Sequence, residues 1–416
     1  MAIHALRAFR HRNFRYYFCG QSVSMIGTWI QQIAMSWLVY RLTDSPFLLG
    51  VTAFAGQIPM LLFGALGGVW SDRVDRHKLL IATQILAMLQ GLALAALVFS
   101  GTVAVWHVIV LAVGLGVITA IDMPLRQAFV PQLVPAREDL AAAIAFNGII
   151  MNTGRMVGPA IAGVLLVYFS EAACFLVNAA TKVVAFAAIL QLSVAPNPRE
   201  ADRKSVVGGL TQGVRYAWDI VPIRILLPVA ALLGFMVTPY QTLLPVFARE
   251  VFRGGPEMLG ILMAAAGVGS MLSPLYHASR RDMRGLTRAI LGGLLVTGVS
   301  LMVFACTHDL WLALMMIGLT GFGLILCAQA IVTILQTIVD DAMRGRIMSL
   351  FMVSFLGMSP LGSLAAGAMA DAVGAEATLL AGGVCCVLGT LMLARQMPRL
   401  REHIRPIYAR LGIVRA

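Results

Sequence analysis

Long apolar runs dominate this chain and restrict what it can fold into. Of its 416 residues, 59% are hydrophobic and only 12% are charged, whereas soluble domains are usually about half apolar at most. A helix of roughly 20 apolar residues is needed to cross the hydrocarbon core of a bilayer. The sequence therefore predicts an all-α membrane protein with twelve transmembrane helices, near residues 14–40, 47–70, 79–99, 105–130, 141–168, 172–192, 223–247, 257–279, 287–305, 310–338, 346–370 and 376–395.

The 31 Lys and Arg residues are distributed unevenly around these spans. If the N-terminus is cytoplasmic, nearly all of them lie in cytoplasmic segments; the exceptions are Arg41, Arg249, Arg253, Arg155 and Lys182. Basic residues collect on the cytoplasmic side of membrane proteins, so we expect a multi-pass protein of a bacterial inner membrane with both termini inside. The net charge of +12 then indicates contact with anionic membrane lipid and not with nucleic acid.

Residues 193–222 form the longest polar interruption, with six predicted spans on each side. This pattern predicts two pseudo-symmetric bundles, 1–192 and 223–395, joined by a cytoplasmic linker over 193–222 and followed by a basic cytoplasmic tail over 396–416. A short internal match supports a duplication, because Gly158 to Gly163 in the fifth span is echoed by Gly362 to Gly367 in the eleventh.

A short charged segment, residues 68–78, separates the second and third spans. It resembles the signature loop of the major facilitator superfamily, whose characteristic positions are matched here by Gly68, Asp72, Arg73 and Arg76. Asp75 stands where that family usually has glycine. The resemblance implies two six-helix bundles working by alternating access, with this loop as part of a cytoplasmic gate.

Two further segments resemble one branch of that superfamily, the bacterial secretion-type exporters. Residues 122–127 at the end of the fourth span match that branch, and Gly154, Gly158 and Pro159 in the fifth span resemble the antiporter motif of the superfamily's exporters. Small residues permit close helix approach, and proline breaks the helical hydrogen-bond ladder. We therefore expect a hinge at these three residues, the alternative being ordinary small-residue packing.

Ionisable residues inside a membrane are costly and need a reason. Asp122 and Arg126 are spaced to form an ion pair within one helix; alternatively, Asp122 exchanges a proton during transport. Arg155 and Lys182 lie deep in the fifth and sixth spans. We expect Arg155 to pair with Asp122 and Lys182 to reach backbone carbonyls from the periphery; in the alternative, one of these cations binds an anionic group of a substrate.

The family resemblance also implies which residues line the central cavity. Helices one, four, seven and ten line it in this superfamily, which places Gln31, Gln32, Tyr240, Gln241 and Gln329 on the wall. Uncharged polar groups among Met and aromatic residues suit a large, mostly apolar ligand. The alternative is that these groups form hydrogen bonds between helices.

These observations predict a secondary active exporter of small amphipathic molecules of drug or siderophore type, operating as a monomer by proton antiport. A uniporter, importer or lipid flippase that recognises an anionic group through Arg155 or Lys182 is the alternative. No phosphate-binding loop supports ATP drive, and no metal-ligand spacing or nucleophile–base pattern indicates an enzyme. We therefore expect no cofactor and no metal.

Overall fold

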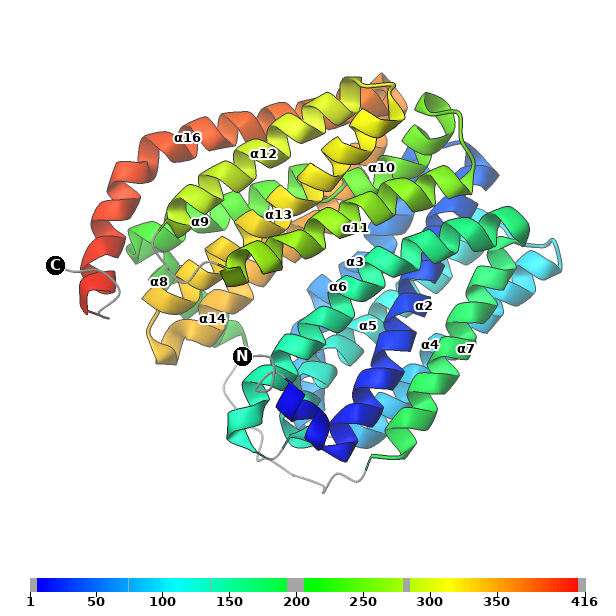
Figure 1. The fold of residues 1–416 in the computed structure, drawn as a ribbon, viewed down its shortest axis with the longest axis horizontal. Helices are drawn as coiled ribbons and strands as arrows, with labels where there is room; N and C mark the ends of the chain where they lie inside the picture. Colours follow the sequence, from blue (N-terminus) through cyan, green and yellow to red (C-terminus); the bar gives the residue numbers. More distant parts are fainter. Residues whose placement is uncertain (1–5, 74, 135, 193–205, 280–284, 411–416) are drawn as a thin grey trace. The chain divides into compact units, whose positions relative to one another are not determined.

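The computed structural model describes residues 6–73, 75–134, 136–192, 206–279 and 285–410, and for residues 65–73 it describes the backbone alone. These residues form helices joined by short turns (Figure 1). Eleven described helical segments are long and apolar enough to cross a membrane. The first predicted span, α2 (Arg12–Thr43), has the length but a lower mean hydropathy, because it carries many polar side chains.

The chain forms two compact units. The first comprises residues 1–202 together with 248–264, and the second comprises 203–247 together with 265–416. In the first unit, α2 packs against two helices of the same unit, α6 and α7, and α4 packs against α7 (Figure 1). Its helices are η1 (Leu6–Arg10), α2, α3 (Pro46–Arg73), α4 (Arg76–Phe99), α5 (Val105–Leu133), α6 (Arg137–Tyr168) and α7 (Glu171–Leu190).

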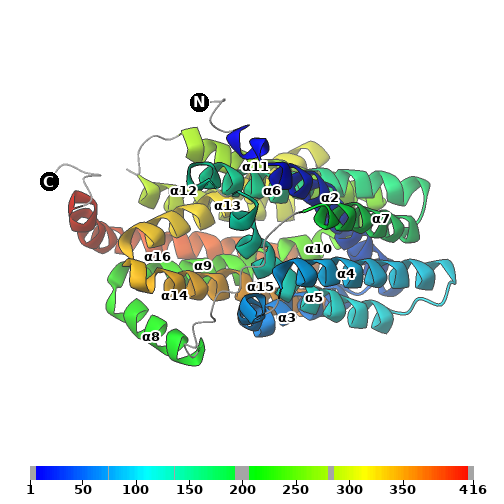
Figure 2. The same ribbon diagram turned by 90° about the horizontal axis from the view of Figure 1, so that it is seen from below.

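The second unit is built mainly from the later helices, with α12 packed against both α13 and α16. The linker helix α8 lies beside α14 (Figure 2). The remaining helices are α8 (Val206–Asp219), α9 (Val221–Leu232), η2 (Leu233–Val237), α10 (Tyr240–Val246), η3 (Phe247–Val251), α11 (Pro256–Ser279), α12 (Leu286–Cys306), α13 (Leu310–Ile338), α14 (Asp341–Met352), η4 (Val353–Gly357), α15 (Met358–Val373) and α16 (Ala375–Arg410). Of these, η3 from residue 248 onward and α11 up to residue 264 belong to the first unit.

Glycines on corresponding helices make corresponding contacts in the two units. A Cβ atom at Gly158 would overlap Trp29, so the fifth span lies directly on the first. A Cβ atom at Gly362 would overlap the Phe235 carbonyl, so the eleventh span lies directly on the seventh. The duplicated glycine segments therefore serve the same packing role in each unit.

Two π-helical turns, η2 and η4, interrupt the seventh and eleventh spans and face one another within the second unit. A Cβ atom at Gly234 in η2 would overlap the carbonyl oxygen of Phe355 in η4. Such turns are rare and occur mostly as single widened turns inside α-helices. Glycine is needed here because the two backbones touch.

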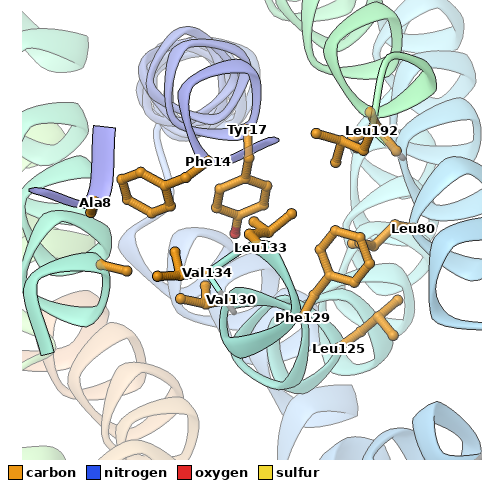
Figure 3. Close-up of a cluster of buried hydrophobic side chains, with 12 residues drawn as sticks. Ala8, Phe14, Tyr17, Leu80, Leu125, Phe129, Val130, Leu133, Val134 and Leu192 are labelled. Carbon is orange, nitrogen blue, oxygen red and sulfur yellow. The ribbon is translucent and has the colours of Figure 1, made fainter. Parts of the chain in front are cut away.

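An apolar cluster packs around one end of the first unit (Figure 3). It joins the start of α2 and the start of α4 to the last turns of α5 and the end of α7. Its larger members are Phe14, Tyr17, Leu80, Phe129 and Leu133, each at most 1% exposed. Under the predicted topology, this is the cytoplasmic end of the bundle.

Candidate functional site

One face of α2 carries buried polar side chains at intervals of three or four residues, the spacing that aligns side chains along a helix. We call Tyr17, Gln21, Ser24, Thr28 and Gln31 the α2 polar row. Four of them are at most 3% exposed, and Thr28 is half-buried. The row is aligned with the interface that α2 forms with α7, to which three of its members, Ser24, Thr28 and Gln31, are hydrogen-bonded.

Asp122 on α5 is held by its own helix and by α4. Its Oδ2 atom lies 2.5 Å from Arg126 Nε. Its Oδ1 atom accepts hydrogen bonds from Thr83 Oγ1 at 2.7 Å and from Gln84 Nε2 at 3.1 Å. Both carboxylate oxygens are therefore engaged. The pair predicted between Asp122 and Arg155 does not form; the alternative, a pair within one helix, is what the structure contains.

Lys182 on α7 points toward α2. Its Nζ atom donates hydrogen bonds to Ser24 Oγ at 2.9 Å and to Thr28 Oγ1 at 2.7 Å, and the residue is 5% exposed. The expectation of a peripheral lysine bonded to backbone carbonyls was wrong, because the hydroxyls of the α2 polar row draw the side chain inward. Within the described part of the chain, no carboxylate forms an ion pair with Lys182.

Gln31 takes part in an amide network inside the first unit. It donates from Nε2 to Gln90 Oε1 at 2.7 Å and accepts from Asn178 Nδ2 at 2.5 Å. Gln90 in turn donates to the Leu111 carbonyl at 3.2 Å. Gln31 is only 1% exposed. It makes hydrogen bonds between helices, which was the alternative to the predicted position on the cavity wall. Gln32, by contrast, is exposed.

Arg155 on α6 lies over an aromatic ring. Its guanidinium carbon is 5.7 Å from the centroid of the Trp29 ring, an arrangement worth about 0.5–1 kcal/mol when partly exposed. The side chain is half-buried, and no carboxylate of the described residues pairs with it. Arg155 therefore keeps hydrogen-bond donors available, which Lys182 does not.

The glycines of the predicted hinge lie against α2. A Cβ atom at Gly158 would overlap Trp29, and one at Gly154 would lie 2.6 Å from Met25 Cγ. These glycines therefore allow α6 and α2 to approach closely. Pro159 lies within α6, which is helical from Arg137 to Tyr168. The hinge itself stays a prediction.

Much of the predicted gate lies outside the described side chains, including Gly68, Asp72 and Arg73. Arg76 is described: its Nη1 atom donates to the Ala128 carbonyl at 3.1 Å and so joins the start of α4 to α5.

Asp75 has a clear local role. It is the N-cap of α4, and its Oδ1 atom accepts hydrogen bonds from the backbone N–H groups of His77 at 2.9 Å and Lys78 at 3.4 Å. Aspartate is among the best residues for this position. The departure from glycine in this loop thus has a physical explanation.

The predicted cavity residues of the second unit differ in exposure. Tyr240 is completely buried, and its hydroxyl accepts a hydrogen bond from Gln241 Nε2 at 3.2 Å. Gln241 and Gln329 are half-buried. Their contact with a substrate stays a prediction.

The residues predicted from sequence did not include several polar side chains that surround Gln31, Asp122 and Lys182. These are Tyr17, Ser24, Thr28, Thr83 and Asn178. A signal for the first three was present. Polar residues three or four apart in an otherwise apolar span indicate a polar face. The partners on α4 and α7 had no such signal, because which helices meet is set by packing.

The chain matches known proteins over nearly its whole length. The family described as transmembrane secretion effectors matches residues 3–406. A staphyloferrin A transporter of Staphylococcus aureus is 28% identical, with 91% of this chain and 94% of the relative covered. The multidrug efflux pump Tap of Mycolicibacterium fortuitum is 28% identical, with 90% and 93% covered. Macrolide efflux protein A of Streptococcus pyogenes is 22% identical, with 88% and 92% covered.

Solved transporter structures share the fold. A bacterial homologue of the human lysosomal transporter Spinster, inward-facing and unoccupied, superposes with a TM-score of 0.72 at 15% identity, covering 94% of this chain and 98% of the other. A POT family transporter in complex with 5-aminolevulinic acid gives a TM-score of 0.76 at 11% identity, covering 94% and 96%. At these identities the likeness concerns the fold alone.

Proposed function

Because this chain belongs to the transmembrane secretion effector family of the major facilitator superfamily, we propose that it exports small amphipathic molecules across a bacterial inner membrane in exchange for protons. It works as a monomer by alternating access, with both termini in the cytoplasm. The match over residues 3–406, together with relatives named for multidrug and macrolide efflux, carries the proposal of export. The relative named for staphyloferrin A extends the substrate class to siderophores.

The buried charges support coupling to protons. A charge inside the bilayer is retained mainly for function, and relays of ionisable groups are common in transporters. Asp122 and Arg126 have side chains only 13–14% exposed, and Lys182 lies within Coulombic range of both. We place the proton-exchange function in this group, with Asp122 as the carboxylate predicted from sequence.

The substrate contacts and the gate rest on the family resemblance. The predicted polar contacts for a mostly apolar molecule are Gln32, Gln241 and Gln329. Gln31 and Tyr240 are buried, and they support these contacts through helix packing. The cytoplasmic gate consists of Gly68, Asp72, Arg73 and Arg76. The hinge of the fifth span consists of Gly154, Gly158 and Pro159.

A second candidate is favoured by the free donors of Arg155. A uniporter, importer or lipid flippase would use that guanidinium to hold a carboxylate or phosphate group of its substrate, because arginine binds such groups through two parallel hydrogen bonds. Lys182 is a weaker candidate for this role, since it is buried and already bonded to two hydroxyls.

Transport in proteoliposomes tests the proposal. With the lumen one pH unit more acidic than the outside, exchange of one proton per molecule supplies about 1.4 kcal/mol, enough for roughly tenfold accumulation. The probes are a labelled macrolide and staphyloferrin A, and a luminal pH dye follows the protons independently. Accumulation that collapses with a protonophore supports antiport. Substrate movement that does not respond to the proton gradient overturns antiport and favours uniport. If transport also requires Arg155 and an anionic group on the substrate, the second candidate is identified.

A further inference from the structure

The charges around Lys182 do not balance. Asp122, Arg126 and Lys182 lie within Coulombic range of one another, and the single carboxylate is already 2.5 Å from Arg126. A protonated Lys182 therefore leaves one uncompensated positive charge in the interior of the first unit. Burying an unpaired charge is strongly unfavourable. Lys182 can therefore alternate between the ammonium and the neutral amine only if its surroundings accommodate both forms.

The hydroxyls around Lys182 accommodate both states. Thr28 donates its own proton to the Ser24 carbonyl at 2.9 Å, so the oxygen facing Lys182 is an acceptor. Ser24 provides a second oxygen, 2.9 Å from Nζ. An ammonium and a neutral amine can each donate to these two oxygens. The site can therefore gain or lose a proton without losing a hydrogen bond or moving the side chain.

The α2 polar row connects this amine with the ion pair on α5. Gln21, one turn from Ser24, is 3% exposed, and neither its oxygen nor its nitrogen has a hydrogen-bond partner among the described residues. The Tyr17 hydroxyl likewise has no hydrogen-bond partner among the described residues, and it lies within Coulombic range of Asp122 and Arg126. Buried polar groups of this kind are normally satisfied, often by ordered water. The row therefore contains two buried side chains, Tyr17 and Gln21, whose hydrogen-bonding groups are open to ordered water.

Among the described residues, the helices packed against α7 place no charged group other than Asp122 and Arg126 within Coulombic range of Lys182. On α2 the facing groups are the hydroxyls and the Gln21 amide, and on α4 Thr83 and Gln84 are bonded to Asp122. α6 directs Arg155 onto Trp29 instead. The charge state of the cluster therefore depends on Lys182 and the Asp122–Arg126 pair.

The spans of the second unit that correspond to α5 and α7 carry no such charges. The tenth span, α13, contains no charged residue, and neither does the part of α16 from 377 to 394. Both helices nevertheless pack against α12. The fold alone therefore does not explain a lysine at position 182.

We propose that Lys182 is a proton-binding site of this transporter, held between Ser24 and Thr28 and within Coulombic range of the Asp122–Arg126 ion pair. The nitrogen lone pair takes up one proton to form the ammonium, and its release restores the neutral amine and removes the uncompensated charge. This inference rests on the proposed proton antiport and names the group that carries the proton.

The test compares variants in proteoliposomes with two readouts. Substrate exchange at equal concentrations without a pH gradient reports an intact transport cycle, and accumulation driven by an acidic lumen reports proton coupling; the labelled macrolide is the probe. Lys182→Met removes the proton-binding nitrogen, and Lys182→Arg keeps a permanent charge. Both should retain exchange, lose nearly all of the roughly tenfold driven accumulation, and lose the pH dependence of transport. Thr390→Val, which removes a buried hydroxyl from α16, should behave like the unmodified protein.

The outcomes separate the two proposals. If the unmodified protein shows no driven accumulation, proton antiport itself fails. If it does, and Lys182→Met exchanges substrate and still accumulates it fully, the assignment to Lys182 is wrong. Should Lys182→Met not fold, Ser24→Ala combined with Thr28→Val provides an independent test. Losing two acceptors disfavours the ammonium, so the pH midpoint of driven transport should shift to lower pH, and an unchanged midpoint would overturn the assignment.

Discussion

Asp75 illustrates how one residue in the charged loop acts through the backbone beneath it. Its carboxylate accepts from two N–H groups of the first turn of α4. Four N–H groups at a helix start lack intrahelical partners, and a side-chain cap satisfies one or two of them. Aspartate therefore stabilises this helix start through its side chain, a contact that glycine lacks.

Replacing Asp75 should change stability according to capping ability and not according to charge. Asp75→Ala should lower the free energy of unfolding by about 1 kcal/mol, while Asp75→Asn should stay close to the unmodified protein and Asp75→Gly within a few tenths. Thermal unfolding of the purified protein in detergent provides the measurement. An Asn variant as unstable as the Ala variant would show that the negative charge matters more than the cap.

The charged residues in the membrane show what the sequence could and could not reveal at this scale. The pair of Asp122 and Arg126 follows from their spacing of four, because residues so spaced are neighbours on a helix. The partner of Lys182 could not be deduced, since it depends on which face of α7 meets α2. Helix–helix packing determines which face of α7 meets α2, and local sequence patterns do not predict it.

Among the elements, contacts between glycine and neighbouring backbone set how closely the helices approach. Gly362 on α15 lies against the carbonyl of Phe235, while Gly292 on α12 has open space where a Cβ atom would be. These two glycines occur in similar apolar helices but have opposite surroundings. The spans themselves were predictable from hydropathy, whereas the identity of each touching pair was not.

Alanine at these two positions should therefore have opposite effects. Gly362→Ala forces a Cβ atom onto a carbonyl that cannot swing aside, and it should cost about 1–3 kcal/mol, the usual range for overpacking. Gly292→Ala gains helix propensity, worth roughly 0.5–1 kcal/mol. Melting temperatures in the same detergent compare the two. Equal destabilisation by both would contradict the close contact with Phe235.

For the whole molecule, the predicted topology places the short connection near Thr102 outside and the basic tail inside. That prediction rests on the near absence of Lys and Arg from the outer connections. No knowledge of helix packing was needed for it. The predicted division into two halves likewise rests on the position of the longest polar segment. The sequence also showed that the charges predicted deep within the spans, Asp122, Arg155 and Lys182, belong to the first half. It could not reveal which helices bring them together.

Cysteine labelling in intact cells tests this topology. In a background without the six native cysteines, Thr102→Cys should react with a membrane-impermeant maleimide, because that exposed residue faces the outside. Glu402→Cys, which is also exposed, should react only after the cells are opened. Labelling of Glu402→Cys in intact cells would reverse the proposed orientation.

The contact between η2 and η4 limits how the second unit can rearrange. A π turn holds one residue more than an α turn, and returning it to α geometry would rotate everything beyond it by about 100°. Gly234 in η2 lies against the Phe355 carbonyl of η4, so the two widened turns are in direct contact. Tyr240 and Gln241 follow η2 after two intervening residues. Closing of η2 would turn them to a new face of their helix in one discrete rotary step, without any bending of the helix axis.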